Sequence, residues 1–318
     1  MKFSITIPTY KAMFLKEAIE SVLSQSYNNW ELIIVDDCSP DDIKSIVEPY
    51  FTNWPIRYYR NNKNCGAKNV VENWNLCLYH CTGDYIICMG DDDKLLPCCL
   101  EEYKKLINAH PNLNVYHARA EIINEKSEII NIQAPRPEWE SVLSFIWNRW
   151  YSRDKQYIGD FCYKTDYLKE VGGYHKLPLA WGSDDITAVK AAEYFGIANT
   201  NEFCFAYREN SLSITSSGNA RLKLKATIEL YKWYENFLNA IMPETLSEQD
   251  KIYWQTINTP KQLYYYRSVG KNCVDIMQGN PFRIITCWKA TRIFGYTLFT
   301  IIRFYFSSLV NIVSSKKT

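Results

Sequence analysis

The stretch Asp84-Tyr-Ile-Ile-Cys-Met-Gly-Asp-Asp-Asp93 joins a short apolar run to three consecutive carboxylates. The apolar run, residues 85–89, predicts a strand that is buried on both faces. Carboxylates that meet at the end of a buried strand repel one another unless a positive charge lies between them. The usual partner is a divalent metal with oxygen ligands. For this stretch taken alone, a solvated acidic turn without a ligand is the alternative.

Apolar strands alternate with amphipathic helices on both sides of this stretch. The alternation predicts an α/β domain with a mostly parallel sheet. Pro8 is expected to end the first strand, because proline cannot donate a hydrogen bond in a central ladder. Ser39 or Asp41 is expected to cap the helix after the second strand. Strands are expected at residues 2–7, 31–35, 56–59, 115–118 and 121–132, and helices at 15–25, 67–80, 98–110 and 186–195.

A second acidic turn, residues 36–42, follows the strand expected at 31–35. Ligands of parallel sheets bind beyond the carboxyl ends of the strands. Both acidic turns follow strands, so we expect them to lie side by side and to form one site.

Charge is distributed unevenly along the 318 residues. The formal net charge is +1, but residues 261–318 hold nine Lys or Arg against one acid, which gives +8 there and −7 for the rest. A basic, aromatic segment on an acidic body indicates contact with an anionic surface, while the acidic body argues against nucleic-acid binding. The eleven cysteines lie mostly in apolar runs, and no secretory signal is recognised, so we expect reduced thiols and a cytoplasmic location.

The C-terminal segment, residues 284–313, is strongly apolar, but Arg303 divides it. Spanning a bilayer takes about 20 apolar residues, and an arginine near the centre of the span is costly. We therefore expect a helix lying in the membrane interface, at the inner face of the membrane. The alternative is a helix that packs on its own domain or on a partner. The cations expected to face anionic lipid are Lys289, Arg292, Arg303, Lys316 and Lys317.

An ordered set of segments resembles the family 2 glycosyltransferases, whose nucleotide-sugar-binding fold is called GT-A. The resemblance spans residues 2–215 and implies a GT-A domain at 1–220 followed by a helical region at 221–318. It implies an inverting transfer from a nucleotide-diphosphate sugar, with a UDP-sugar as first choice, to a glycan or lipid-linked acceptor in surface polysaccharide or lipopolysaccharide synthesis. The segments are SITIPTY (4–10), LKEAIESVLSQ (15–25), ELIIVDDCSPDD (31–42), NCGAKNVVENWN (64–75), residues 83–97, VGGY (171–174) and SDD (183–185).

The family's acidic pattern is Asp-x-Asp-Asp followed by three residues and Pro. Aligned on Pro97, it places Gly90 where the first Asp often stands. The resemblance then implies that Asp92 binds Mn²⁺ or Mg²⁺, that Asp91 lies near the ribose or diphosphate, and that Asp93 is a structural cap. An offset of one residue would make Asp91 and Asp93 the metal-binding pair.

The resemblance also implies a donor site. Asp36 or Asp37 would contact the base or ribose, since a carboxylate accepts hydrogen bonds from a uracil N–H or from sugar hydroxyls. Arg208, expected on a loop, would close over the diphosphate, with a surface arginine as the alternative. The full donor-binding set is Pro8, Thr9, Tyr10, Asp36, Asp37, Gly66, Lys68, Asn69, Asp91 and Arg208.

On the acceptor side, the resemblance implies that Asp185 is the general base and that Asp184 binds acceptor hydroxyls. Capping of the following helix explains one of these acids without any catalytic role. The tryptophans Trp139, Trp147 and Trp150 suit either a core or a sugar-binding surface.

Two other functions fit the acidic clusters. A metal-dependent nucleotidyltransferase or phosphoesterase also uses aspartates at strand ends, and Gly90 is compatible with a non-catalytic sugar-binding protein. A dinucleotide-binding protein is disfavoured, because no G-x-G-x-x-G motif follows a strand.

Overall fold

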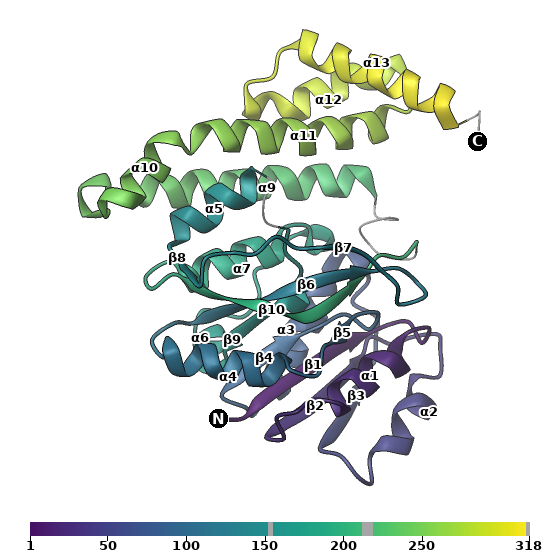
Figure 1. Ribbon diagram of the computed structural model, residues 1–318. Coiled ribbons are helices and arrows are strands. Elements are labelled where there is room, and N and C mark those ends of the chain that lie inside the picture. Colours follow the sequence, from purple (N-terminus) through teal and green to yellow (C-terminus); the bar gives the residue numbers. More distant parts are fainter. Residues whose placement is uncertain (152–154, 212–218, 316–318) are drawn as a thin grey trace.

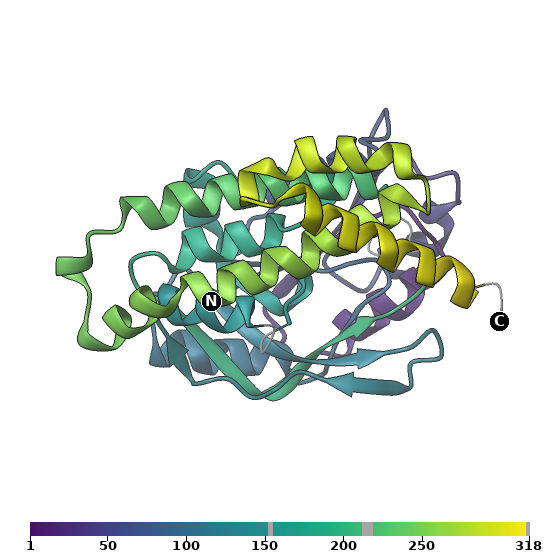
Figure 2. The same cartoon turned by 90° about the horizontal axis from the view of Figure 1, so that it is seen from above.

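The computed structural model describes residues 1–151, 155–211 and 219–315, with side chains up to Val310. An α/β unit forms one part of the molecule, and a layer of C-terminal helices covers one side of it (Figure 1). Viewed from above, these helices lie across the α/β unit (Figure 2).

One sheet of ten strands runs through the α/β unit, in the order β3-β2-β1-β4-β9-β6-β10-β5, with β7 beside β6 and β8 beside β10. The strands are β1 (Phe3–Thr9), β2 (Trp30–Asp36), β3 (Ile56–Arg60), β4 (Tyr85–Cys88), β5 (Lys94–Leu95), β6 (Val115–Ile123), β7 (Ile129–Ile132), β8 (Trp139–Glu140), β9 (Phe161–Lys164) and β10 (Ile197–Arg208).

The sheet is mixed, so the prediction of a mostly parallel sheet is wrong. Strands β3, β2, β1 and β4 are parallel, as are β6 and β10, whereas β9 lies antiparallel between β4 and β6. Residues 124–128 join β6 to β7, and so short a connection permits only antiparallel neighbours. An apolar run predicts a buried strand but carries no information about its direction, which is why the sequence did not reveal this arrangement.

The helices cover both faces of the sheet and then build the C-terminal layer. They are α1 (Leu15–Leu23), α2 (Ile43–Val47), α3 (Val70–His80), α4 (Cys99–Ala109), α5 (Val142–Trp150), α6 (Thr165–Glu170), α7 (Ser183–Ala192), α9 (Ala220–Ala240), α10 (Glu248–Thr256), α11 (Asn258–Met277), α12 (Ile284–Thr291) and α13 (Leu298–Ser315).

Two local predictions need correction. Asp42, rather than Ser39 or Asp41, caps α2 by accepting a hydrogen bond from the Ser45 N–H at 3.3 Å. Pro8 does not end β1, which continues to Thr9. The β1–β4 pairing stops at Thr6, and the Pro8 nitrogen faces that unpaired side, so its missing N–H removes no hydrogen bond from the ladder.

The C-terminal helices share a core with the sheet. On one sheet face, α1 and α4 pack over apolar side chains of β1 and β2. On the other face, Leu230 and Tyr234 of α9 and Tyr265 of α11 join the cluster that contains Trp150 of α5. A third cluster fills the space between α11 and α13. The boundary expected at residue 220 therefore separates two segments that bury apolar surface together.

The eleven cysteines are all free thiols, as expected, and eight of them are buried. Among the helices of the described residues, none has the length and apolar character needed to cross a membrane.

Candidate functional site

The two acidic turns lie side by side, as predicted, and Thr9 at the end of β1 connects them. The Asp37 N–H donates to the Thr9 carbonyl at 2.9 Å. On the other side, the Thr9 hydroxyl donates to Asp91 Oδ2 at 3.0 Å, and the Tyr10 and Lys11 N–H groups donate to the same oxygen at 2.8 and 2.9 Å. β1 lies between β2 and β4, so its end organises both turns.

Asp36 is fully buried and holds the turn after β2. It accepts hydrogen bonds from the Ser39 N–H and the Tyr58 hydroxyl, both at 2.7 Å, and forms an ion pair with Arg60. Burial, and then the hydrogen bond to Asp36, raises the pKa of Tyr58 to about 12, so this hydroxyl stays protonated. Asp36 therefore stabilises this turn through its partners and presents no unpartnered carboxylate at the sheet edge.

Asp37 organises the loop that leads into α3. One of its oxygens accepts from Asn61 Nδ2 and from the Cys65 N–H, both at 2.9 Å. Gly66 follows with a φ of 76°, a conformation that favours glycine. Lys68 and Asn69 are exposed on the short 3₁₀ turn after it. The predicted donor-binding residues of this loop are thus placed at the same edge as Asp37.

The three aspartates after β4 have different partners. Asp92 Oδ2 accepts from Asn210 Nδ2 at 2.6 Å, and Asp93 Oδ1 accepts from the Arg208 N–H at 2.9 Å. Their other oxygens face Gly90: a Cβ there would lie 2.7 Å from Asp92 Oδ1 and 2.9 Å from Asp93 Oδ2. Glycine at this position therefore leaves room for two carboxylate oxygens to approach the same point.

Arg208 is the last residue of β10 and not a loop residue, so its expected position is wrong. Its side chain is buried and stacks over the Phe14 ring at 4.2 Å. Its guanidinium donates to the Asp92 carbonyl at 2.7 Å and to Glu17 Oε2 at 2.9 Å. Arg208 thus fixes the turn that carries the aspartates, and closure over a diphosphate would require it to leave these partners.

A cavity of about 530 Å³ lies between the sheet and the C-terminal helices. Asp93 contributes to its wall from the acidic turn, and Asp184 and Asp185 contribute from the first turn of α7. The helix begins after Gly182, which has a φ of 90°. A Cβ at Gly182 would lie 2.8 Å from Leu230 Cδ2, so the close approach of α9 requires glycine here.

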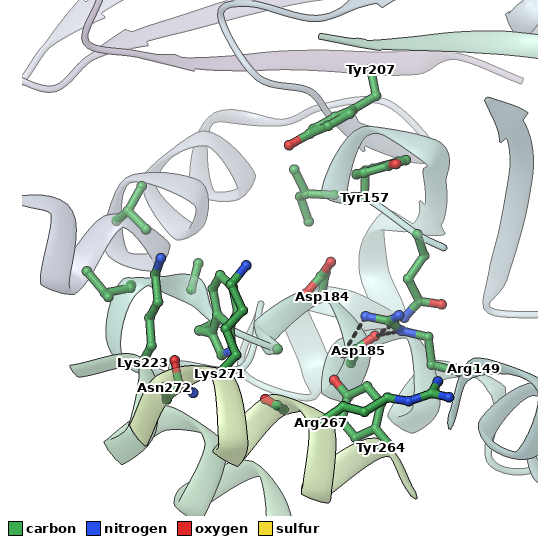
Figure 3. Close-up of a pocket in the computed structure, with 18 of the residues that line it drawn as sticks. Arg149, Tyr157, Asp184, Asp185, Tyr207, Lys223, Tyr264, Arg267, Lys271 and Asn272 are labelled. Atoms are coloured by element: carbon green, nitrogen blue, oxygen red, sulfur yellow. Dashed lines mark hydrogen bonds and ion pairs between the residues drawn. The ribbon is translucent and has the colours of Figure 1, made fainter. Parts of the chain in front are cut away.

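Asp184 and Asp185 point in different directions (Figure 3). The Asp185 carboxylate accepts from Arg149 Nε at 2.8 Å and from Arg149 Nη2 at 3.3 Å, and it also accepts from Gln156. Asp184 points into the cavity. Burial, followed by the charge of Asp185, raises the pKa of Asp184 to about 8, although Arg149 opposes the shift.

The remaining wall combines aromatic rings with cations, and the sequence did not identify these residues. Tyr157 and Tyr207 stack with their centroids 3.7 Å apart, and Lys223 lies over the Trp181 ring at 4.9 Å. The polar positions along α11 repeat every three or four residues, which was a usable signal of one helix face. The α11 residues in the wall are Tyr264, Arg267, Ser268, Lys271, Asn272 and Asp275.

The tryptophans considered for sugar binding lie away from this cavity wall. Trp150 is buried in the core beside Tyr234. Trp147 donates to Thr256 Oγ1 at 3.0 Å, and Trp139 donates to the Phe195 carbonyl at 2.9 Å. Trp74 and Trp181 line the cavity instead.

Comparison with known proteins identifies the family. The model of glycosyl transferase family 2 matches residues 4–172, slightly more than half of the chain. The chain belongs to this family.

Two curated relatives resemble the N-terminal part of the chain. EpsE of Bacillus subtilis (strain 168), named as a glycosyltransferase, is 40% identical over 103 residues, which cover 32% of this chain and 36% of EpsE. WcaA of Escherichia coli (strain K12), named for colanic acid biosynthesis, is 40% identical over 119 residues, or 36% of this chain and 39% of WcaA. The chain therefore matches well under half the length of these relatives.

Solved structures extend the likeness of fold to nearly the whole chain. S. aureus TarS 1-349 in complex with UDP-GlcNAc aligns with a TM-score of 0.61 at 14% identity, over 99% of this chain and 92% of that chain. The complex of TarS 1-349 with UDP aligns with a TM-score of 0.57 at 16% identity. The α/β unit and the helices that cover it thus follow a glycosyltransferase fold of the GT-A type.

Proposed function

We propose that this protein transfers a sugar from a nucleotide-diphosphate sugar to a hydroxyl group of a glycan or lipid-linked acceptor. The observation that carries the proposal is the position of Asp184, which points into a cavity whose wall also includes Asp93 of the acidic turn after β4. A glycosyl transfer needs a general base and a donor-binding turn at the same cavity. A UDP-sugar is our first choice of donor, supported by the UDP and UDP-GlcNAc complexes of TarS.

Mn²⁺ or Mg²⁺ fits the acidic turn. The oxygens Asp92 Oδ1 and Asp93 Oδ2 both face the open position beside Gly90. Among the described residues, no group of three or more His, Cys, Asp or Glu forms a complete metal site. Such a turn suits Mg²⁺, which usually takes one or two carboxylates and completes its shell with substrate phosphates and water. When bound, the ion would offset the charge of the departing diphosphate. Asp92 would be its main ligand and Asp93 a second one.

The geometry favours Asp184 over Asp185 as the general base. The Asp185 carboxylate is occupied by Arg149 and Gln156, whereas Asp184 faces the cavity. A general base must reach the proton it removes and must have a pKa near the working pH. In our proposal Asp184 is the general base, and Asp185 is a positioning residue that holds Arg149 and Gln156 at the cavity wall.

The proposed reaction is a single displacement with inversion. The acceptor oxygen forms a bond to the anomeric carbon while the bond from that carbon to the diphosphate oxygen breaks. The nucleoside diphosphate leaves with the bonding electrons, and the acceptor proton passes to Asp184. The stacked Tyr157 and Tyr207 offer apolar ring surface beside this acid. The name of WcaA supports a place in surface polysaccharide synthesis.

The C-terminal helices also support contact with the inner face of a membrane. Phe299, Phe306 and Val310 of α13 are 69%, 60% and 63% exposed, and Arg303 lies on the same helical face. Apolar side chains with a cation among them suit an anionic lipid interface. Removal of residues 281–318 would uncover the apolar cluster between α11 and α13, so exchange of surface residues is the cleaner test.

The membrane test uses sedimentation with anionic phosphatidylglycerol vesicles. The variant Phe299→Ser/Phe306→Ser/Val310→Ser should remain in the supernatant while the unaltered protein pellets. A matched control is Ile129→Ser/Ile130→Ser/Ile132→Ser, which removes three side chains of β7 that are 58%, 52% and 50% exposed. Equal pelleting of both variants and the unaltered protein would overturn the membrane role of α13.

The test of the enzymatic function is a thermal-shift screen with UDP-, GDP- and dTDP-sugars, with Mn²⁺ or with a chelator. A ligand at 100 times its Kd should add about 2.7 kcal/mol of stability. We expect a shift for one nucleotide class that is lost with chelator and in Asp92→Asn but kept in Asp184→Asn. A folded protein that responds to no nucleotide sugar, or that hydrolyses nucleotides without forming a glycoside, would contradict the proposal.

A further inference from the structure

One polar face of α11 is turned toward the cavity. Tyr264, Arg267, Lys271 and Asp275 lie three or four residues apart and all belong to its wall. Arg267, Lys271 and Asp275 are exposed, so this face borders both the cavity and solvent. The helix thus lines the same cavity as Asp184, the proposed general base (Figure 3).

The charges in the wall are divided between its two sides. Four basic and four acidic residues contribute to it. Arg149 is paired with Asp185, and Asp93 and Asp184 belong to the α/β unit. The α9 and α11 side therefore holds three cations, Lys223, Arg267 and Lys271, against the single acid Asp275.

Lys223 is the most enclosed of these cations, with 8% of its surface exposed. Its pKa is lowered, first by burial and then by the charge of Lys271, while Asp275 acts in the opposite direction. Two ammonium groups that lie close enough to repel each other are stabilised by an anion bound between them. A cleft with low-dielectric walls also concentrates the field of such charges.

We propose that Lys223 and Lys271 form a subsite for a phosphate group of the acceptor. The inference rests on the proposed transfer reaction and names the class of its acceptor: a glycan or lipid-linked sugar that carries phosphate close to the hydroxyl receiving the new sugar. Asp184 would face that hydroxyl, while the α9 and α11 cations hold the phosphate.

The diphosphate of the donor is the other possible source of phosphate. Its place in our proposal is the turn with Asp92 and Asp93, where a metal ion offsets its charge. Figure 3 shows Tyr157 and Tyr207 on one side of Asp184, and Lys223 and Lys271 on α9 and α11 across the cavity from these rings. Asp93 reaches this cavity from the turn after β4, whereas the two lysines reach it from α9 and α11.

The test is calorimetric titration of the full chain with α-glucose 1-phosphate, and with methyl α-glucoside as the uncharged counterpart. The variant Lys223→Gln/Lys271→Gln should bind glucose 1-phosphate at least about tenfold more weakly than the unaltered protein, since two charge-assisted contacts are lost. The matched control Lys225→Gln/Lys232→Gln removes the same charge from α9 outside this cavity wall and should change nothing. The unaltered protein should bind methyl α-glucoside more weakly than the phosphate.

A parallel titration with UDP and Mn²⁺ separates the two sources of phosphate. UDP affinity should be the same in both double variants. If Lys223→Gln/Lys271→Gln weakens UDP but not glucose 1-phosphate, the cations serve the donor and the inference is overturned. Equal binding of glucose 1-phosphate and methyl α-glucoside, or no binding of glucose 1-phosphate, also overturns it. If the unaltered protein binds no UDP, the result contradicts the proposed function itself and not only the phosphate subsite.

Discussion

Arg149 binds both oxygens of the Asp185 carboxylate, with its Nε 2.8 Å from Oδ1 and its Nη2 3.3 Å from Oδ2. Asp184, one residue earlier, faces the cavity instead. Consecutive residues of a helix point about 100° apart, so the start of α7 can direct one acid to a structural partner and the other to a substrate. Two carboxylates in unlike environments can take unlike roles.

Replacement of each acid by its amide should separate these roles. Asp184→Asn should lower kcat by about 10³-fold, the middle of the range for a general base, without weakening UDP binding. Asp185→Asn should lower the free energy of unfolding by up to about 3 to 5 kcal/mol, because it leaves the Arg149 guanidinium unpaired. Single-turnover kinetics and urea unfolding measure the two effects.

A matched double variant tests the partner assignment. Asp185→Asn/Arg149→Gln should recover part of the lost stability, because the two changes remove one interaction. The assignment of the base to Asp185 would be correct instead if Asp185→Asn abolished turnover with unchanged stability while Asp184→Asn stayed active.

The pKa of Asp184 predicts opposite effects of pH on activity and stability. It is raised to about 8, by burial and then by Asp185, with a smaller contribution from Asp160 and opposition from Arg149. Only the carboxylate form can accept a proton, so kcat should rise with pH up to about 8.

The stability effect has the reverse sign. The folded chain keeps the Asp184 proton up to a pH of about 8, whereas the unfolded chain releases it near the ordinary value of 3.8. The native state then binds more protons than the unfolded state, so this group lowers stability as pH rises across that window. Tm of the unaltered protein should fall relative to that of Asp184→Asn over the same range. Parallel Tm curves for the two proteins would show that the pKa of Asp184 is not raised.

Gly90 provides a test of the proposed metal turn. A Cβ there would meet Asp92 Oδ1 at 2.7 Å and Asp93 Oδ2 at 2.9 Å. Both contacts are the ends of side chains, which can turn aside, so Gly90→Ala should change the free energy of unfolding by less than about 1 kcal/mol. The displaced oxygens should weaken UDP binding in the presence of Mn²⁺ by about tenfold, which corresponds to about 1.4 kcal/mol. Calorimetry with chelator is the control, because without the metal the variant and the unaltered protein should both bind UDP only weakly and to the same extent. An unchanged affinity with Mn²⁺ would exclude these oxygens as ligands.

The acidic edge of the sheet could be predicted from sequence because its signals are local. Uniformly apolar strands and the acids directly after them place Asp36, Asp37 and Asp91 at one edge, as expected. The connection of both turns through Thr9 was not foreseen. The direction of β9 and the place of Arg208 on a strand were not predictable in this way, because they depend on pairing between distant segments.

The surroundings of Asp184 and Asp185 depend on residues distant in the chain, which the sequence did not reveal. Which of Asp184 and Asp185 faces the cavity is decided by Arg149 and Gln156, which lie 36 and 29 residues from Asp185 in the chain. The polar face of α11 was visible as a spacing of three and four residues, but nothing local shows that it lines the cavity. The packing of α9 and α11 against the α/β unit supplies that information.

The contact between Gly182 and Leu230 tests how α9 is attached to the site. Gly182 has a φ of 90°, and a Cβ there would lie 2.8 Å from Leu230 Cδ2. Gly182→Ala should lower the free energy of unfolding by about 2 to 4 kcal/mol, from left-handed backbone strain of about 1 kcal/mol and overpacking of about 1 to 3 kcal/mol. Leu230→Ala alone should cost about 2 to 5 kcal/mol.

In the double variant Gly182→Ala/Leu230→Ala the clash disappears while the backbone strain remains. The loss of stability should therefore be smaller than the sum of the two single losses, by about 1 to 3 kcal/mol. Urea unfolding of the four proteins measures this coupling. Strictly additive losses would show that the two residues do not press on each other, and that α9 is held over Asp184 by other contacts.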